Sequence, residues 1–293
     1  MSERPLISPE NLLAHLDDPV WAIVDCTFEL SQPLQGESEY LQSHIPGAVY
    51  ADLERDLSAT RDGKNGRHPL AAPQALAVVF SRLGIDGSSM VVAYDRSGGA
   101  YASRLWWSLR YLGHFKVAVL DGGFPAWLKA GYPARSGGEK REPTHFVPSV
   151  QTKMLVKADE IDRPGEKTLR LLDARAPERY RGDEEPLDLA AGHIPGAVNV
   201  FWKDNLDEEG GFISSELLEK RYRRVLGRYP PSVAVAYCGS GVTACHLLLA
   251  MEHAGISGAR LYAGSWSEWS SDSSRPLALG DEPLPSGSSP QIA

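Results

Sequence analysis

The chain has 293 residues, a length that predicts about two domains rather than one. Its composition is that of an ordinary soluble globular protein, with 42% hydrophobic and 23% charged residues. The net charge of −8 argues against nucleic acid as the main partner, but small anionic substrates stay open because a local field can oppose the net charge. No apolar run approaches a membrane span and the N-terminus lacks secretory features, so we expect a cytoplasmic protein without a membrane partner.

The chain contains three cysteines, Cys26, Cys238 and Cys245. They are too few for a disulfide framework, and their spacing does not fit a zinc site. We therefore expect no metal and no cofactor. Cys26 follows an apolar run that is typical of a buried strand. Cys245 falls on a predicted helix, where we expect it to be a packing residue whose thiol points away from the loop that follows Cys238.

The same sequence blocks recur in both halves of the chain. In the first half they are a strand ending in aspartate, a His-Ile-Pro-Gly-Ala-Val turn, a helix, a strand ending in Ala-Tyr and an aromatic block, at residues 22–25, 44–49, 75–83, 91–94 and 120–127. Their counterparts are residues 171–173, 193–198, 216–226, 233–237 and 262–269. Alternating strands and helices predict an α/β fold, with a mainly parallel sheet covered by helices in each half.

Residues 133–143 are polar and rich in helix and strand breakers, which is typical of a linker between domains. We therefore predict an N-terminal domain at residues 1–134, a linker at 135–150 and a C-terminal domain at 151–293. The tail from Ser271 onward is rich in Ser, Pro and Gly, and we expect it to be loosely ordered.

Cys238 stands where the predicted strand of the second half gives way to a small-residue loop and then a helix. The loop residues that follow it are Gly239, Ser240, Gly241, Val242 and Thr243. Inward-pointing N–H groups and a helix N-terminus favour a thiolate, so we interpret Cys238 as a nucleophile and the loop as an anion cradle. The alternative is a small, inert, buried residue. The first half carries Asp95 at this position, so we expect that half to be a non-catalytic wall of the site.

These blocks, together with Gly-Ser-Trp-Ser-Glu-Trp at 264–269, resemble the tandem rhodanese-type sulfurtransferases over nearly the whole chain. The resemblance implies two tandem rhodanese-like domains, the second of them catalytic. Within the superfamily, the loop at 238–243 is similar to that of the 3-mercaptopyruvate sulfurtransferases. Thiosulfate-type rhodaneses usually carry basic residues where this chain has Gly239 and Ser240. A neutral pair suits a donor with one carboxylate and a ketone better than it suits a small dianion.

The resemblance also implies an arginine for the substrate carboxylate, and Arg179 matches it. Arg175 is expected to be structural, tying the strand end to nearby carboxylates. Many family members have a second arginine a short distance further along the chain. Here that region reads Glu185-Pro186-Leu187-Asp188, without an arginine, so the charge must come from elsewhere or the donor binds less tightly.

The remaining candidates have competing structural interpretations. Ser240 is expected to relay a proton or hold the substrate ketone, and Thr243 to cap the next helix. His44 is placed by the resemblance either at the catalytic cleft or in its turn, whereas its duplicate His193 is expected to be structural. Tyr101 and Arg104 are candidates to line the cleft as substrate-binding residues.

The reaction implied by the resemblance moves sulfur from 3-mercaptopyruvate through a Cys238 persulfide to a thiol such as thioredoxin, or to cyanide, and releases pyruvate. Thiosulfate:cyanide sulfur transfer is the alternative within the enzyme class. A non-catalytic rhodanese module used for binding is the alternative outside it, and the cysteine argues against that interpretation. Phosphatase chemistry is disfavoured because Ala244 stands where an arginine would clamp phosphate.

Overall fold

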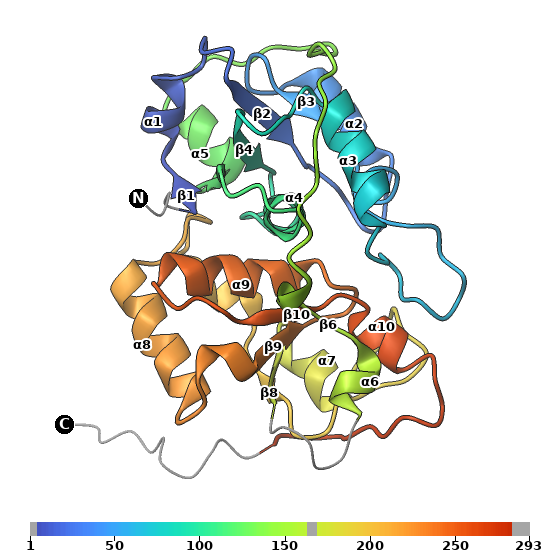
Figure 1. Cartoon of the computed structure of the whole chain (residues 1–293). Helices are drawn as coiled ribbons and strands as arrows, with labels where there is room; N and C mark the ends of the chain where they lie inside the picture. The colour runs from blue at the N-terminus through green and yellow to red at the C-terminus, as the bar shows by residue number, and fades with distance from the viewer. Residues whose placement is uncertain (1–4, 163–168, 283–293) are drawn as a thin grey trace, which may run out of the picture. The chain divides into compact units, whose positions relative to one another are not determined.

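The chain divides into two compact units, each built on its own parallel sheet (Figure 1). The computed structural model describes residues 5–162 and 169–282. The first unit comprises Met1–Thr60, Leu70–Thr152 and Leu206–Phe212, and the second comprises Arg61–Pro69, Lys153–Asn205 and Ile213–Ala293. Each unit therefore contains one short segment from the opposite half of the sequence. Neither exchange was expected from the sequence.

The first unit contains a five-stranded sheet in the order β1-β5-β4-β2-β3, with every neighbouring pair parallel. Its strands are β1 Leu6–Ile7, β2 Trp21–Asp25, β3 Val49–Tyr50, β4 Met90–Tyr94 and β5 Val117–Leu120. Its helices are α1 Pro9–Leu13, α2 Gln35–Gln42, α3 Pro73–Arg82, α4 Ala102–Tyr111 and α5 Gly123–Lys129.

The second unit repeats this topology strand for strand, in the order β6-β10-β9-β7-β8. Its strands are β6 Leu155–Val156, β7 Arg170–Asp173, β8 Val198–Asn199, β9 Ala234–Tyr237 and β10 Arg260–Tyr262. Its α-helices are α6 Ala158–Ile161, α7 Pro177–Arg181, α8 Ser215–Leu226, α9 Thr243–His253 and α10 Ser265–Trp269. Short 3-10 helices occur at η1 Thr152–Met154, η2 Trp202–Asn205 and η3 Pro231–Val233. The predicted fold class is confirmed.

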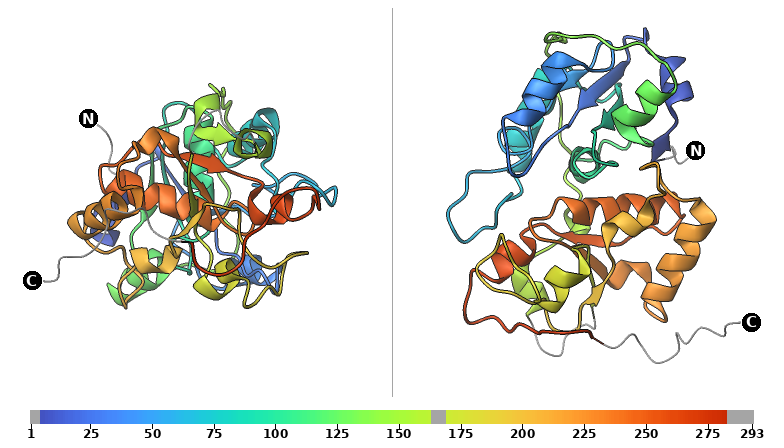
Figure 2. Two further views of the ribbon diagram at one scale, coloured as in Figure 1. Left: turned by 90° about the horizontal axis from the view of Figure 1, so that it is seen from below. Right: turned by 180° about the vertical axis from the view of Figure 1, so that it is seen from behind.

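The central strands are buried along nearly their whole length, because helices flank each sheet. This is why they appear in the sequence as continuous apolar runs rather than as alternating patterns. In the second unit α9 packs on β9 and β10, and α8 packs beside α9, as the right-hand view of Figure 2 shows. The packing places the loop after β9, which begins with Cys238, at the carboxyl edge of the sheet.

The two His-Ile-Pro-Gly turns have the same geometry. Nδ1 of His44 lies 2.8 Å from the Tyr40 carbonyl oxygen, and Nδ1 of His193 lies 2.8 Å from that of Tyr180. Each imidazole is fully buried and stacks on the ring of the tyrosine whose carbonyl oxygen it contacts. The match between the two units favours a structural role for both histidines.

Each turn is also bonded to the end of its central strand. The Ile45 N–H donates to the hydroxyl of Tyr94, the last residue of β4, at 3.1 Å. In the second unit Ile194 donates to Tyr237, the last residue of β9, at 3.3 Å. In each unit, the tyrosine of the repeated Ala-Tyr pair therefore holds the His-Ile-Pro-Gly turn against the central strand. The loop that begins at Asp95 or Cys238 follows directly after that strand.

The predicted linker at 135–150 lies within the first unit and is hydrogen-bonded to it. Arg135 exchanges backbone hydrogen bonds with His44, and the Thr144 N–H donates to the Ser81 carbonyl. A matching bridge joins His193 to Ala278 in the second unit. The expectation of a loosely ordered tail is therefore wrong for residues 271–282, while residues 283–293 lie outside the described residues.

Across the two described ranges, no helix combines the length and the apolar character that crossing a membrane requires.

Gly47→Ala and Gly196→Ala should each destabilise the protein by about 1–2 kcal/mol, because both glycines have a φ of +77° that L-residues rarely adopt. An added Cβ would meet nothing within 4 Å at either position, so the cost is backbone strain alone. Urea unfolding measures it. Gly87→Ala is the control, with equal space and no positive φ, and a comparable loss there would contradict the argument.

Candidate active site

Cys238 is fixed by the start of α10. Its N–H donates to the Ser265 hydroxyl at 3.1 Å, and its carbonyl accepts from the Trp266 N–H at 2.9 Å. The Ser265 hydroxyl in turn donates to the Tyr262 carbonyl at 2.9 Å. Cys238 as a whole residue is 2% exposed. Its backbone is therefore held on both sides before any substrate contributes.

At two positions of the loop, other atoms approach the backbone so closely that only glycine fits. Gly241 has a φ of +75°, and a Cβ there would collide with the Ala263 carbonyl oxygen. A Cβ on Gly239 would lie 2.6 Å from Nη2 of Arg67 and 3.3 Å from Nη1 of Arg179. The small residues that the sequence singled out thus let both the backbone of 263 and two guanidinium groups approach the loop.

The first unit shows what a loop of this kind binds. The Asp95 side chain is fully buried at the position equivalent to Cys238. Its carboxylate accepts four backbone N–H groups at 2.7–2.9 Å, those of Ser97, Gly99, Tyr101 and Ala102. Four converging donors define an anion cradle. The cradle predicted around Cys238 therefore has an occupied counterpart within the same chain.

The backbone around the two loops matches as well. The Asp95 carbonyl accepts from the Phe124 N–H at 2.9 Å, as the Cys238 carbonyl accepts from Trp266. The residue before each aromatic donor has a positive φ, +58° at Gly123 and +56° at Ser265. Ser265 is the one residue other than glycine with a positive φ in the described chain. A strained residue beside a candidate nucleophile is typical of a functional site.

Ser240 forms a close pair with His68. The hydroxyl oxygen lies 2.7 Å from Nδ1 of the imidazole, and both residues are buried. His68 belongs to the segment Arg61–Pro69 of the second unit. This histidine was not among the residues predicted from the sequence. The only available signal was an Arg-His pair in a polar loop, and nothing in that pattern indicates which unit the loop joins.

Arg175 is held by buried carboxylates, as expected. It donates to Asp173 at 2.6 Å and lies 3.4 Å from Glu185. Burial opposes its charge, but the Asp173 carboxylate outweighs that effect and raises the pKa of Arg175 above its ordinary value. Its guanidinium also lies over the Trp266 ring, 4.8 Å from the centroid. These contacts fix Glu185 and α10 to the strand end, which is a structural role.

Arg179 and Arg67 share one carboxylate. Arg179 donates to Glu185 at 2.7 Å and to Oδ2 of Asp188 at 3.0 Å. Arg67 donates to the other oxygen of Asp188. Burial raises the pKa of Asp188, although both arginines act in the opposite direction. Asp188 therefore bridges two guanidinium groups next to the loop.

Two predictions about the loop are wrong. Val242 is the N-cap of α9 and Thr243 is its first residue, with no side-chain hydrogen bond to the helix end. Thr243 therefore does not cap the helix. The Cys245 thiol donates to the Gly241 carbonyl at 3.3 Å, so it faces the loop rather than away from it. It lies one helical turn beyond the glycine, which brings the two groups together.

The candidates in the first half lie in the first unit. Tyr101 is the N-cap of α4 and gives its backbone N–H to Asp95, and Arg104 is fully buried on the same helix. A role in substrate binding stays a prediction for Tyr101, Arg104 and His44. Among the described residues, no group of three or more His, Cys, Asp or Glu side chains could hold a metal ion.

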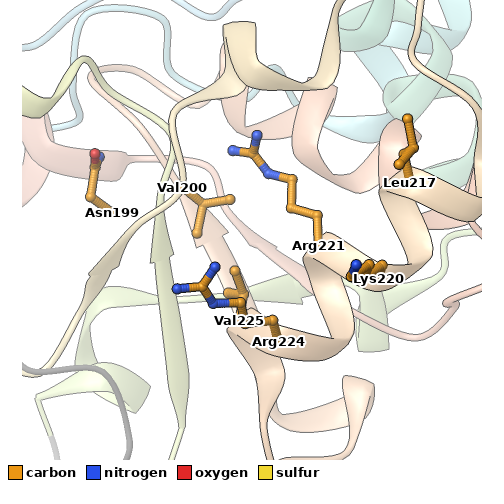
Figure 3. Close-up of a pocket in the computed structure, with 7 residues that line it drawn as sticks. All are labelled: Asn199, Val200, Leu217, Lys220, Arg221, Arg224 and Val225. Carbon is orange, nitrogen blue, oxygen red and sulfur yellow. The ribbon is translucent and has the colours of Figure 1, made fainter. Parts of the chain in front are cut away.

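A separate pocket of about 370 Å³ lies between α8 and the end of β8 (Figure 3). Its lining residues are Asn199, Val200, Leu217, Lys220, Arg221, Arg224 and Val225. Figure 3 shows the Arg221 and Arg224 side chains extending from α8 toward the segment that carries Val200. Arg221 is already bonded to the Phe201 carbonyl and to Asp204. The pocket contains no nucleophile and none of the residues around Cys238.

Comparison with known proteins identifies the family to which the chain belongs. The model of the rhodanese-like domain matches residues 8–130 and 157–272, one copy in each half of the chain. The chain therefore belongs to the rhodanese family. It is 46% identical over 284 residues to a protein of Pseudomonas aeruginosa named "Probable 3-mercaptopyruvate sulfurtransferase", covering 96% of this chain and 100% of that one.

Other relatives are named for two different sulfur donors, thiosulfate and 3-mercaptopyruvate. The thiosulfate sulfurtransferase of Rattus norvegicus is 34% identical, covering 86% of this chain and 85% of that one. Among solved structures, the 3-mercaptopyruvate sulfurtransferase SseA of Escherichia coli superposes with a TM-score of 0.77 at 32% identity, over 91% of this chain and all of that one. The enzyme from Leishmania major gives a TM-score of 0.81 at 31% identity, over 91% and 74%.

Ser265→Ala should be less stable than Ser265→Gly. Both changes leave the buried Cys238 N–H without its acceptor, at a cost of about 1–3 kcal/mol. Glycine additionally relieves the strain of the positive φ, worth about 1–2 kcal/mol, as Gly123 does in the first unit. Urea unfolding of the two variants tests the order. Equal stability would mean that the backbone at 265 is not strained.

Proposed function

We propose that the protein is a sulfurtransferase that takes sulfur from 3-mercaptopyruvate onto Cys238 and passes it to a thiol or to cyanide. The observation that carries this proposal is the position of Cys238, at the place where the first unit holds the Asp95 carboxylate with four N–H groups. A loop of that kind suits a thiolate before the reaction and a persulfide anion after it. The relatives named for this donor support it.

In the first step, the Cys238 thiolate attacks the sulfur of 3-mercaptopyruvate. A sulfur–sulfur bond forms, and the carbon–sulfur bond breaks with its electron pair leaving as the enolate of pyruvate. The donor's thiol proton is released from the new persulfide, and one proton is taken up by the enolate carbon. The products are pyruvate and a persulfide anion on Cys238, so the charge stays on sulfur in the cradle.

Ser240, His68 and Arg179 serve this step. The Ser240 hydroxyl, 2.7 Å from the His68 imidazole, moves the proton between the persulfide and the enolate. Arg179 binds the carboxylate of the donor with the guanidinium donors that face Gly239. In the second step cyanide or a thiol, such as that of reduced thioredoxin, attacks the outer sulfur and restores the Cys238 thiolate. A cytoplasmic setting, where thiols stay reduced, suits three free cysteines.

Thiosulfate is the second candidate donor. Gly239 and Ser240 supply no positive charge, which is why the sequence favours 3-mercaptopyruvate over thiosulfate. Arg67 supplies such a charge, because its Nη2 is the atom nearest to a Cβ added at Gly239. The relative named for thiosulfate favours the same candidate. The neutral loop alone therefore does not decide between the donors.

The donor is decided by kcat/KM for sulfur transfer to cyanide, measured with 3-mercaptopyruvate and with thiosulfate. We expect 3-mercaptopyruvate to be preferred at least about tenfold, the equivalent of one charge-assisted hydrogen bond to its carboxylate. A preference for thiosulfate would reassign the donor and leave the persulfide mechanism intact. Cys238→Ser should abolish transfer from both donors, and retention of activity by that variant would refute the mechanism.

The three cysteines should differ in reactivity. Burial raises the pKa of Cys26 well above its ordinary value, and the carboxylates of Asp25 and Asp95 act in the same direction, so Cys26 stays a thiol at neutral pH. Brief treatment with iodoacetamide should modify Cys238 first, as read by peptide mass spectrometry. Prior loading with 3-mercaptopyruvate should add the mass of one sulfur atom to the Cys238 peptide. Loading on Cys26 instead would contradict the assignment.

A further inference from the structure

Hydrogen bonds fix both walls of the pocket between α8 and the end of β8 (Figure 3). On one side, Nδ2 of Asn199 donates to the carbonyl oxygens of Asp173 and Arg175 at 3.1 Å and 2.8 Å. On the other side, the Val225 carbonyl accepts from Nη2 of Arg170 at 2.8 Å. Both walls are therefore tied to β7 and its end, and the pocket has its shape before a ligand enters.

Part of the lining is apolar, and it consists of Val200, Leu217 and Val225. Val200 is 2% exposed, whereas Leu217 is 56% exposed. A single exposed leucine is ordinary on a protein surface, but this one borders a cavity of about 370 Å³. That volume falls in the range of small-molecule pockets, about 300–1,000 Å³. The pocket can therefore take the apolar body of a small molecule out of water.

Three cationic side chains of α8, those of Lys220, Arg221 and Arg224, line the same pocket. Arg221 is already paired with Asp204 at 3.1 Å. Within the described residues, neither Lys220 nor Arg224 forms an ion pair. The chain as a whole has a net charge of −8, so these two cations make the pocket a local positive site on an acidic protein.

The helix dipole does not account for the direction of these charges. Cations in the last turn of a helix stabilise its dipole, and Arg223 and Arg224 both occupy that turn of α8. Arg223 is paired with Glu219 at 2.6 Å and does not line the pocket. Arg224 instead extends toward the segment that carries Val200 (Figure 3). The two arginines thus serve the dipole equally but differ in what they face.

We propose that this pocket binds a small organic acid that carries a carboxylate on an apolar body. Arg224 and Lys220 bind the carboxylate, and Val200 and Leu217 contact the body. The guanidinium can give a carboxylate two parallel N–H groups, and the ammonium adds a third donor. An inorganic anion would leave the apolar wall unused, and a neutral molecule would leave the cations unused. The site goes beyond sulfur transfer, because it contains no residue of the loop at Cys238.

The probe is octanoate, titrated into the full-length protein by isothermal titration calorimetry. Acetate keeps the carboxylate without the body, and 1-octanol keeps the body without the charge. We expect octanoate to bind at least about tenfold more tightly than either, because each of them lacks one of the two contacts. The inference is overturned if octanoate shows no saturable binding, or if acetate or 1-octanol binds as tightly.

Lys220→Ala combined with Arg224→Ala should weaken octanoate binding about 10- to 100-fold, the loss of one or two charge-assisted hydrogen bonds. Arg223→Ala is the matched control, because it removes the same charge from the same turn of α8 without touching the pocket. Its affinity for octanoate should equal that of the unaltered protein. An equal loss in both variants would mean that the charge of the helix, not the pocket, attracts the ligand.

Two single variants test the location of the ligand. Leu217→Asp places a carboxylate at the pocket in the first turn of α8, where an acidic residue favours the helix, so the protein should fold and bind octanoate at least about tenfold more weakly. Arg179→Ala should leave octanoate binding unchanged. Unchanged binding by Leu217→Asp, or a loss in Arg179→Ala, would place the ligand elsewhere and overturn the inference. Binding is read without sulfur transfer, so a failure of the proposed function leaves this test intact.

Discussion

The interpretation of the site depends on one constraint, the convergence of backbone N–H groups at the end of the central strand of the first sheet. Asp95 shows the constraint directly, because four N–H groups donate to its buried carboxylate. N–H groups aimed at one point are costly to bury without an acceptor, so the loop needs an anion there. A carboxylate meets that need permanently. Cys238 takes the place of that aspartate in the second unit, which is why we propose that the same kind of loop serves as the reactive site there.

The duplication shows which contacts the two units have in common. The turn histidines, the tyrosines at the ends of β4 and β9, and the backbone bonds to Phe124 and Trp266 are the same in both units. These contacts hold the loop and do not depend on what the loop binds. The side chain at position 95 or 238 could therefore change without disturbing the frame, and the first unit retains the frame with a fixed anion.

The sequence was sufficient to predict the features that repeat or that follow from local order. The fold class, the two sheets and the loop after β9 came from matched blocks and apolar runs, and Arg175 from its strand-end aspartate. Arg67 and His68 were missed because the segment Arg61–Pro69 has no periodicity, and its partners Asp188 and Ser240 are distant in sequence. The ordered stretch 271–282 was missed because its anchors, such as the bridge from Ala278 to His193, are tertiary contacts that composition does not encode.

The placement of Arg67 also shows how two guanidinium groups can lie together beside the loop. A free pair of adjacent guanidinium groups would repel each other and move apart, whereas a buried carboxylate bonded to both fixes their separation. Preorganised charges of this kind lose little freedom on binding and act strongly where water is scarce. Because His68 follows Arg67 directly, a single fitted segment positions both the second guanidinium and the partner of Ser240. A change in the length of that segment would therefore displace Arg67 and His68 together.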